Sequence, residues 1–307
     1  MANKFIISID LGGTNLRVAL LDLKYGFIDK LNFSTKKFVK KDDLISAIVD
    51  SVSNIIRENN LKKKNILGVG LGLPGPIDVK LGIVHFFPNI PGWKEVALKA
   101  ILKQRLRLPV FLDNDANLMS LAESKLGAAK GFKNVVCLTL GTGVGGGLII
   151  SGTLYRGSTF AAGEIGHIPI NEAGPHCNCG GSACLESYIG NKVIMKDAKK
   201  LFKRDISLEE LSALAKRRNR IAGRIWSKIA KSLGTALVGI VNLLNPDCIV
   251  IGGGIANAGA ILFDNVRQII ASQAMSVQAK HVKILKARLS DDAGLIGAGI
   301  LVYENLH

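Results

Sequence analysis

The sequence lacks the features that mark secreted, disulfide-stabilised proteins. Its 307 residues include five cysteines, an odd number that does not fit a framework of paired disulfides. The first apolar run, residues 5–9, ends at Asp10 and is shorter than the roughly 7–15 apolar residues of a secretory signal. We therefore expect a cytoplasmic protein.

Long uninterrupted apolar runs are also missing, which argues against a chain that spans a membrane. Two stretches, 134–155 and 248–263, carry no charged residue, and the first has the about 20 residues that a membrane helix needs. Glycine clusters interrupt both stretches, and this favours strands and turns. We expect no membrane association.

The composition excludes disordered and collagen-like chains. Hydrophobic residues make up 48% and charged residues 21% of the chain, so enough apolar surface is present to offset the entropy of folding. The 34 glycines follow no G-X-Y period, so they indicate tight turns or ligand-binding loops.

Acidic residues are scarce relative to basic ones. Asp and Glu number 24 against 40 Lys and Arg, which gives a net charge of +16. A surplus of this size is compatible with nucleic acid or another polyanion as a partner. The lysines are scattered, however, and the longest basic run is only 62–64. This favours a solvated basic surface, and we expect no specific nucleic-acid partner.

Strand and helix patterns alternate along the chain, which predicts an α/β fold. The expected strands are 5–9, 16–22, 27–33, 66–73, 110–112, 135–140, 148–150, 249–251 and 282–289. The expected helices are 42–60 with Asp42 as N-cap, 93–106, 116–125, 186–202, 207–217, 219–244, 258–278 and one from 293.

The order strand, glycine turn, strand occurs near residue 10 and again at 135–150. This weak internal echo suggests two similar halves that face one cleft. We predict an N-terminal small lobe over 1–116 and a C-terminal large lobe over 117–292. The last helix, 293–307, is expected to return to the first lobe.

Three glycine-rich turns are candidates for binding phosphate. At 10–17 (DLGGTNLR), Gly12 and Gly13 let the backbone approach an anion, Thr14 adds a hydroxyl donor and Asp10 suits a metal-bound water; an ordinary hairpin turn is the alternative. Residues 141–147 (GTGVGGG) contain G-x-G-x-x-G, but a strand rather than a helix follows. A dinucleotide fingerprint is therefore rejected in favour of a phosphate-clasping hairpin.

The third turn, 252–254, lies between a strand and a helix. A ligand resting on bare backbone and a plain βα turn are both compatible with it.

Residues 113–117 (DNDAN) lie where a strand meets a helix, the position at which α/β proteins bind ligands. One of these side chains must cap the helix. The remaining carboxylate is suited to act as a general base for an alcohol during phosphoryl transfer.

A zinc site is indicated by His167, Cys177, Cys179 and Cys184. Three thiolates and one imidazole complete a closed, tetrahedral shell of the structural type, and glycines at 174, 180 and 181 allow tight turns. Glu164 and Glu186 flank these residues. A zinc-braced loop would hold both carboxylates where they can bind vicinal hydroxyls.

Together these motifs resemble the ROK (repressor, open reading frame, kinase) family of sugar kinases, within the actin-like ATPase superfamily. The resemblance spans essentially the whole chain, with ordered matches at 10–17, 73–78, 114–117, 122–123, 140–147, 163–167, 177–186 and 252–254. It implies an α/β fold of two actin-like ATPase (ribonuclease H-like) lobes around a central cleft, with a zinc-stabilised loop. One departure is Ala183, where the family usually has glycine.

The resemblance implies that Asp115 is the base that deprotonates the primary hydroxyl of a sugar. The implied sugar-binding residues are Gly75, Asn89, Asn114, Asp115, Glu164, His167 and Glu186. The implied ATP-phosphate contacts are Gly12, Gly13, Thr14, Thr142, Gly143 and Gly145, with Gly253 and Gly254 beside the adenosine. Asp10 is expected to orient Mg²⁺, and His167 to serve both zinc and sugar.

We therefore expect an ATP-dependent hexose kinase, most simply one that converts glucose to glucose 6-phosphate, and by family resemblance a homodimer. N-acetylmannosamine, N-acetylglucosamine, fructose, mannose and allose stay open as substrates, and polyphosphate as donor. The alternatives are a non-catalytic sugar-sensing regulator and a DNA-binding repressor. Family repressors carry a winged helix-turn-helix ahead of the core, for which the motif at Asp10 leaves no room. A nucleic-acid zinc finger is disfavoured because 186–194 has one lysine.

Overall fold

The computed structural model describes residues 4–38, 40–87 and 92–307. The chain divides into two compact units. Unit 1 comprises Met1–Ala122, Arg156–Ala162 and Asp291–His307, and unit 2 comprises Glu123–Tyr155 and Gly163–Ser290. The short segment Arg156–Ala162 therefore interrupts unit 2 in sequence but belongs to unit 1 in space.

Unit 1 is built on a five-stranded sheet in the order β3-β2-β1-β4-β8. β1 runs antiparallel to β2 and parallel to β4, and β4 runs parallel to β8. The strands are β1 (Phe5–Leu11), β2 (Asn15–Leu21), β3 (Phe27–Ser34), β4 (Ile66–Leu73) and β8 (Val110–Asn114). A smaller sheet joins β5 (Ile77–Asp78), β6 (Ile83–Phe86) and β7 (Lys94–Val96).

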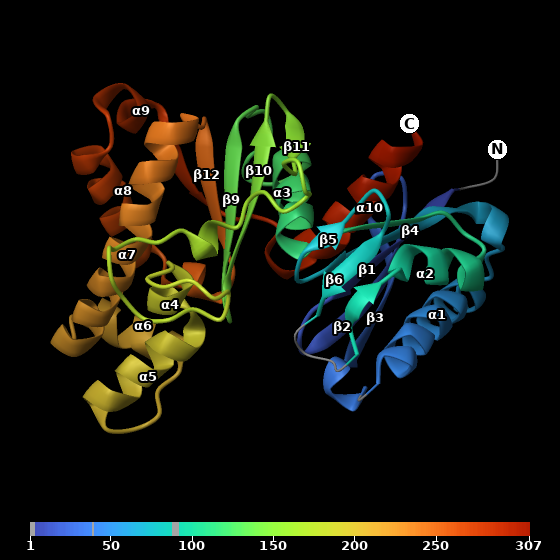
Figure 1. Ribbon diagram of the computed structural model, residues 1–307, viewed down its shortest axis with the longest axis horizontal. Helices are drawn as coiled ribbons and strands as arrows, with labels where there is room; N and C mark the ends of the chain where they lie inside the picture. Colours follow the sequence, from blue (N-terminus) through green and yellow to red (C-terminus); the bar gives the residue numbers. More distant parts are fainter. Residues whose placement is uncertain (1–3, 39, 88–91) are drawn as a thin grey trace. The chain divides into compact units, whose positions relative to one another are not determined.

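Helices bury both faces of the larger sheet. Ile7 and Ile9 of β1 point into a core shared with α1 (Lys41–Glu58) and α2 (Leu98–Leu106), whereas Ile6 packs with α10 (Ala293–Leu306) on the other face. Figure 1 shows α10, in red, beside the blue strand β1 and β4, although almost the whole chain separates them in sequence.

Glycines along one face of β4 allow this close packing. Gly68, Gly70 and Gly72 alternate along the strand, and a Cβ on Gly70 would lie 2.0 Å from the carbonyl oxygen of Ala298 in α10. No side chain fits there, so α10 rests directly on the strand backbone.

Unit 2 repeats the same sheet. Its strand order is β11-β10-β9-β12-β13, with β9 antiparallel to β10 and parallel to β12. The strands are β9 (Val135–Leu140), β10 (Val144–Ile150), β11 (Thr153–Tyr155), β12 (Cys248–Gly252) and β13 (Lys283–Lys286). The internal echo in the sequence thus corresponds to a repeated topology.

The core of unit 2 lies between its sheet and a group of helices. These are α4 (Glu186–Ile189), α5 (Asn191–Phe202), α6 (Leu208–Lys216), α7 (Arg220–Leu244), α8 (Ala260–Gln273) and α9 (Ser276–His281). By length and composition α7 is apolar enough to cross a membrane. Its buried residues, Trp226 and Leu233 among them, belong to the core of unit 2, so α7 is the central helix of that core.

Several predicted elements were wrong in their bounds. The predicted helix 93–106 begins only at Leu98, because residues 94–96 pair with β6 as strand β7. The predicted helices 186–202 and 258–278 are each two helices, the first broken at the extended Gly190. Asp42 does not cap α1; it lies inside the first turn, where a carboxylate favours the positive end of the helix dipole.

Two other predictions were wrong in extent. β10 begins at Val144, so Gly145 lies in a strand and the glycine turn covers only 141–143. The predicted strand 282–289 is limited to Lys283–Lys286. The predicted boundary at 116/117 falls inside the continuous helix α3 (Asp115–Lys125), which passes from unit 1 to unit 2 after Ala122.

Glu123 fastens the start of unit 2. This fully buried carboxylate accepts hydrogen bonds from the backbone N–H groups of Ala128 (2.7 Å), Arg288 (2.9 Å) and Leu289 (2.8 Å). Residues 288–289 immediately precede the return of the chain to unit 1. The side chain of Glu123 therefore links the segment that follows α3 to residues 288–289, close to two of the points at which the chain passes from one unit to the other.

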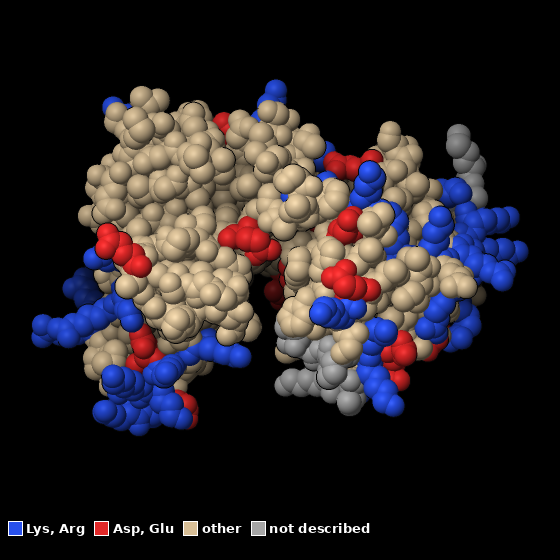
Figure 2. All heavy atoms as spheres, viewed as in Figure 1, with Lys and Arg blue, Asp and Glu red and all other residues tan. Residues whose placement is uncertain are grey.

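The basic residues are less scattered in space than in sequence. Residues 192–231 hold thirteen Lys and Arg against four Asp and Glu, and all thirteen are exposed. Figure 2 shows basic side chains gathered over the end of unit 2 that carries α5. Helical spacing of three or four residues brings them onto one face of each helix: Lys192, Lys196, Lys199 and Lys200 on α5, and Arg220, Arg224, Lys228 and Lys231 on α7.

Replacing Glu123 with glutamine should lower the free energy of unfolding by about 1–3 kcal/mol, because an amide leaves at least one buried N–H donor without an acceptor. Thermal unfolding followed by circular dichroism measures the change. Glu58→Gln is the matched control, since that carboxylate is 64% exposed and pairs only with Arg57 on the surface. Equal midpoints for the two variants would contradict the role of Glu123.

Candidate functional site

The candidate residues of unit 1 lie at one edge of its sheet. β1, β4 and β8 are parallel neighbours, so their carboxyl ends meet at the same edge, where ligands bind in α/β sheets. Asp10 is near the end of β1, Gly75 follows β4, and Asn114 and Asp115 stand at the end of β8 and the start of α3.

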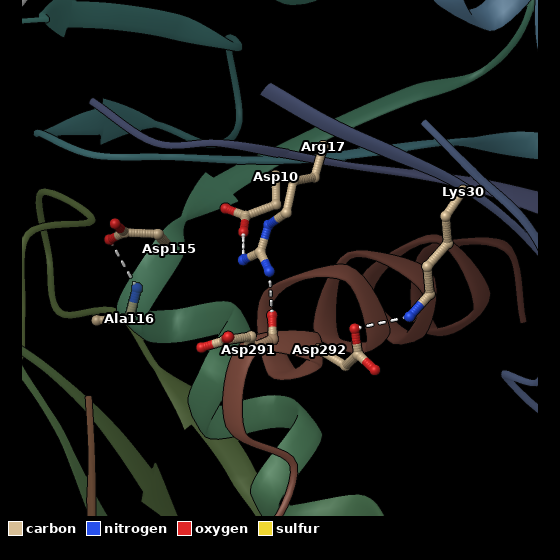
Figure 3. A network of polar contacts seen from close by, with 7 residues as sticks. All are labelled: Asp10, Arg17, Lys30, Asp115, Ala116, Asp291 and Asp292. Atoms are coloured by element: carbon tan, nitrogen blue, oxygen red, sulfur yellow. Dashed lines mark hydrogen bonds and ion pairs between the residues drawn. The ribbon is translucent and has the colours of Figure 1, made fainter. Parts of the chain in front are cut away.

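Asp10 is bound by an arginine. Arg17 stands directly opposite Asp10 in the β1–β2 register, and its Nη2 forms an ion pair with Asp10 Oδ2. Arg17 Nη1 also donates to the carbonyl oxygen of Asp291, 2.6 Å away, just before α10. Figure 3 shows this network, together with the pair between Lys30 and Asp292. The carboxylate predicted to orient Mg²⁺ therefore already has a cationic partner.

The turn after β1 has the expected shape for approaching an anion. The Gly12 N–H donates to the carbonyl oxygen of Asn15 at 2.8 Å and closes the turn. Gly13 and Thr14 are exposed at its tip. Backbone and hydroxyl donors are thus presented at the same edge of the sheet as Asp10.

At the β8–α3 junction, Asn114 and Asp115 both accept hydrogen bonds from the first turn of α3, and Asn114 also contacts Gly75. Asn114 caps α3, since its Oδ1 accepts from the Ala116 N–H at 2.9 Å, and its Nδ2 donates to the carbonyl oxygen of Gly75 at 3.3 Å. Asp115 is partly exposed, and its Oδ1 accepts from the Ala116 N–H at 2.8 Å (Figure 3). The cap that the sequence required is Asn114.

The pairing of Asp113, part of the motif 113–117, with Arg156 was not predicted from the sequence. Asp113 is 1% exposed and forms an ion pair with Arg156 at 2.7 Å. It stands in one row of the sheet with Asp10, separated from it by Gly72. Unit 1 therefore has two carboxylates in one row, each paired with an arginine. A charged residue ending an apolar strand was the only signal for Asp113, and nothing in the sequence linked it to Arg156.

In unit 2, the turn 141–143 follows β9, and Gly253 and Gly254 follow its parallel neighbour β12. Thr142 is exposed at the tip of its turn. Glu186, at the start of α4, lies against this turn: its Oε2 accepts from the Val144 N–H at 2.8 Å. The structure thus brings Glu186 to the glycine turn.

Close backbone packing positions Glu164 and His167. They lie on the segment 163–167, which includes the 3-10 turn Ile165–His167. A Cβ on Gly146 of β10 would lie 2.4 Å from the carbonyl oxygen of Gly163, and a Cβ on Gly166 would lie 2.1 Å from that of Val144. The segment therefore lies flat on β10, which explains why this strand is rich in glycine.

The four predicted metal ligands form one cluster. One ligand atom from each of His167, Cys177, Cys179 and Cys184 lies within 4.8 Å of all the others. The Cys179 and Cys184 sulfurs are 3.7 Å apart, and Cys177 Sγ is 3.5 Å from His167 Nδ1. A tetrahedral zinc with ordinary bond lengths requires about 3.8 Å between two sulfurs and about 3.5 Å between sulfur and nitrogen. The donor set and its spacing therefore fit zinc.

The thiols of the cluster titrate differently. Burial opposes ionisation of Cys177, but hydrogen bonds from Cys179, Ser187 and His167 outweigh it and lower the pKa to about 7. Burial, together with the neighbouring Cys179 and Cys177, raises the pKa of Cys184 to about 12. A thiol of this kind ionises readily only when a cation stands beside it.

His167 faces two ways. Its Nδ1 is turned to Cys177, and its Nε2 lies 4.0 Å from Glu164 Oε2. One ring nitrogen therefore faces the cysteine cluster and the other faces the carboxylate of Glu164, and the expected use of His167 by both zinc and sugar stays a prediction. Asn89, the remaining predicted sugar contact, lies outside the described residues.

Comparison with known proteins gives the family. The model of the ROK family matches residues 6–305 of this chain. The chain belongs to the ROK family. It is 34% identical over 319 residues to a glucokinase of Halalkalibacterium halodurans, with 99% of this chain and 96% of that protein covered.

Other ROK relatives differ in activity. A solved ROK glucokinase of Streptomyces griseus, in complex with glucose and AMPPNP, is 29% identical with a TM-score of 0.81, over 98% of this chain and 99% of that one. A xylose repressor of Caldicellulosiruptor bescii is 30% identical over 314 residues, 98% of this chain and 78% of that protein. The mixed α/β fold is that of ROK kinases, and both kinases and repressors align with nearly the whole chain.

The structure explains the one departure from the ROK pattern. Ala183 has a backbone φ of +56°, in the left-handed region that glycine occupies without steric cost. The cysteine loop therefore keeps this conformation at a steric cost that a glycine at this position would not have.

Adding a methyl group at Gly146 should displace the segment 163–167, because backbone lies where the Cβ would be. Gly146→Ala should lower the free energy of unfolding by about 1–3 kcal/mol, the usual cost of overpacking. Gly141→Ala is the control, because nothing lies within 4 Å of its Cβ position. Chemical denaturation compares the two. A Gly146 variant as stable as the Gly141 variant would refute this packing.

Proposed function

We propose that this ROK protein is an ATP-dependent sugar kinase that phosphorylates the primary 6-hydroxyl of a hexose, with glucose converted to glucose 6-phosphate. The observation that carries the proposal is Asp115, a partly exposed carboxylate at the carboxyl edge of the parallel strands β1, β4 and β8, the edge at which the turn of Gly12, Gly13 and Thr14 also follows β1. Relatives named as glucokinases support the choice of sugar.

In this mechanism Asp115 accepts the proton of the attacking hydroxyl as the bond to phosphorus forms, which is the role of the base in phosphoryl transfer. Asp113 is unsuited to that role because it is buried and bound by Arg156. The proposed sugar-hydroxyl ligands are Gly75, Asn89 and Asn114 in unit 1 and Glu164, His167 and Glu186 in unit 2.

ATP is proposed to bind through both glycine turns. The main chain at Gly12, Gly13, Gly143 and Gly145, with the hydroxyls of Thr14 and Thr142, would lie against the phosphates, and Gly253 and Gly254 would lie beside the adenosine. Mg²⁺ bound with ATP supplies charge neutralisation. Asp10 would hold it, and its carboxylate suits a hard cation, with Arg17 sharing that carboxylate.

We propose a structural zinc at His167, Cys177, Cys179 and Cys184. The spacing of the four donors supports it, and no ligand position is left for catalysis in a closed Cys₃His shell. The ion would keep the loop that leads to Glu186 rigid and would hold the ring of His167. It would also offset the effect of burial and of the neighbouring thiols, which together raise the pKa of Cys184 to about 12.

A second candidate is a sugar-sensing regulator, because xylose repressors align with 98% of this chain at 30% identity. Such a protein would bind the sugar without turnover. The proposal is completed by a cytoplasmic homodimer without a membrane or specific nucleic-acid partner.

Release of ADP from MgATP, coupled to a dehydrogenase assay, should be fastest with glucose in a panel with mannose, fructose, allose and the two N-acetylhexosamines. Asp115→Asn should lower kcat by about 10²–10⁴, the usual contribution of a general base, without loss of folding. Asp50→Asn, at an exposed position on α1, is the control. Sugar binding without turnover by the wild type would support the regulator instead.

Purified protein should contain one zinc ion per chain by elemental analysis, and Cys179→Ser should lose it. Cys248→Ser, in the buried strand β12, should keep the metal. Zinc binds thiolate, and protons compete for it. Zinc should therefore be released progressively as the pH is lowered. Full metal content in Cys179→Ser would exclude this site.

A further inference from the structure

The carboxylate of Asp113 is the most heavily hydrogen-bonded side chain near the proposed base. Its Oδ2 accepts from Arg156 Nε at 2.8 Å and forms the ion pair with Nη2 at 2.7 Å. Its Oδ1 accepts from the Asn114 N–H at 2.8 Å and from Asn117 Nδ2 at 2.9 Å. Four donors therefore converge on one buried carboxylate.

Two of these donors belong to residues that flank Asp115 in the sequence. Asn114 immediately precedes it, and Asn117 lies two residues after it in the first turn of α3. Asp113 thus ties together both sides of the turn that presents Asp115. The same turn carries the cap at Asn114, whose Nδ2 reaches Gly75. The conformation of the proposed base and of two proposed sugar contacts therefore depends on Asp113 staying charged and fixed.

Burial makes that charge costly unless a cation is present. A carboxylate removed from water is tolerated only when it is paired and hydrogen-bonded. Arg156 supplies the positive charge and two of the four hydrogen bonds, and it is itself only 25% exposed. It comes from the segment Arg156–Ala162, which follows β11 of unit 2 in sequence yet is part of unit 1.

We infer that Arg156 is a positioning residue for phosphoryl transfer: by neutralising Asp113 it fixes the β8–α3 turn that aims Asp115 and Asn114. Without Arg156, Asp113 either takes up a proton and loses acceptor capacity or moves toward water, and in both cases the turn loosens. A misplacement of about 1 Å at a reacting group can cost about 10² in rate. The inference rests on the kinase activity proposed above.

The first test does not depend on kinase activity. Hydrogen exchange measured by mass spectrometry should become faster in Arg156→Gln for the peptide covering 113–118, with β1 and α1 unchanged. Arg57→Gln, an exposed arginine paired with Glu58, should exchange as the wild type does. Unchanged protection at 113–118 in Arg156→Gln would overturn the inference, whether or not the wild type is a kinase.

The second test is kinetic. Arg156→Gln should lower kcat by about 10²-fold and leave the KM for MgATP unchanged. The kcat of Arg156→Lys should lie between those of the wild type and Arg156→Gln, because lysine keeps the positive charge but lacks the two adjacent N–H donors of the guanidinium. If Arg156 acts through Asp115, the double variant Arg156→Gln/Asp115→Asn should be no slower than Asp115→Asn alone. Losses that multiply would show an independent structural effect and contradict the inference.

A double variant tests whether the unpaired charge of Asp113 is what loosens the turn in Arg156→Gln. Asp113→Asn/Arg156→Gln leaves no unpaired buried charge, so its kcat and its protection at 113–118 should exceed those of Arg156→Gln. A wild type that is inactive with every sugar would reject the kinase proposal, and the exchange experiment would still decide the role of Arg156.

Discussion

Parallel pairing of a few strands is the constraint on which the rest of the structure depends. In unit 1, β1, β4 and β8 run the same way, so their carboxyl ends share one edge, and Asp10, Gly75 and Asp115 come together there. In unit 2, β9 and β12 do the same for the turn 141–143 and Gly253. Because only the carboxyl ends carry these motifs, one sheet topology used twice presents two glycine turns in equivalent positions.

Three carboxylates with little exposure to solvent are each stabilised by hydrogen-bond donors, either from an arginine side chain or from backbone N–H groups. Asp10 and Asp113 stand in one row of the sheet of unit 1, and each is paired with an arginine from another segment. Glu123 is satisfied instead by three backbone N–H groups. In each case the donors come from other segments of the chain, and the cost of burying the carboxylate is offset only when those segments are in place.

Glycine determines where backbone meets backbone. On β4 the alternating glycines let α10 rest on the strand, and on β10 they let the segment with Glu164 and His167 lie flat on the sheet. The same reasoning applies to Ala183, where the cysteine loop keeps a left-handed backbone without glycine. These positions are informative because any side chain there would have to move main chain rather than a flexible neighbour.

The sequence by itself determined the α/β class, most strands and helices, the three glycine turns and the Cys₃His cluster, because periodicity and ligand spacing are local properties. Only tertiary structure decided that 94–96 form a strand, since β6 supplies their hydrogen-bond partners. It also joined Arg156 to Asp113, forty-three residues away. Ion pairs between distant segments leave no periodic trace in a sequence, since their partners become neighbours only when the fold brings them together.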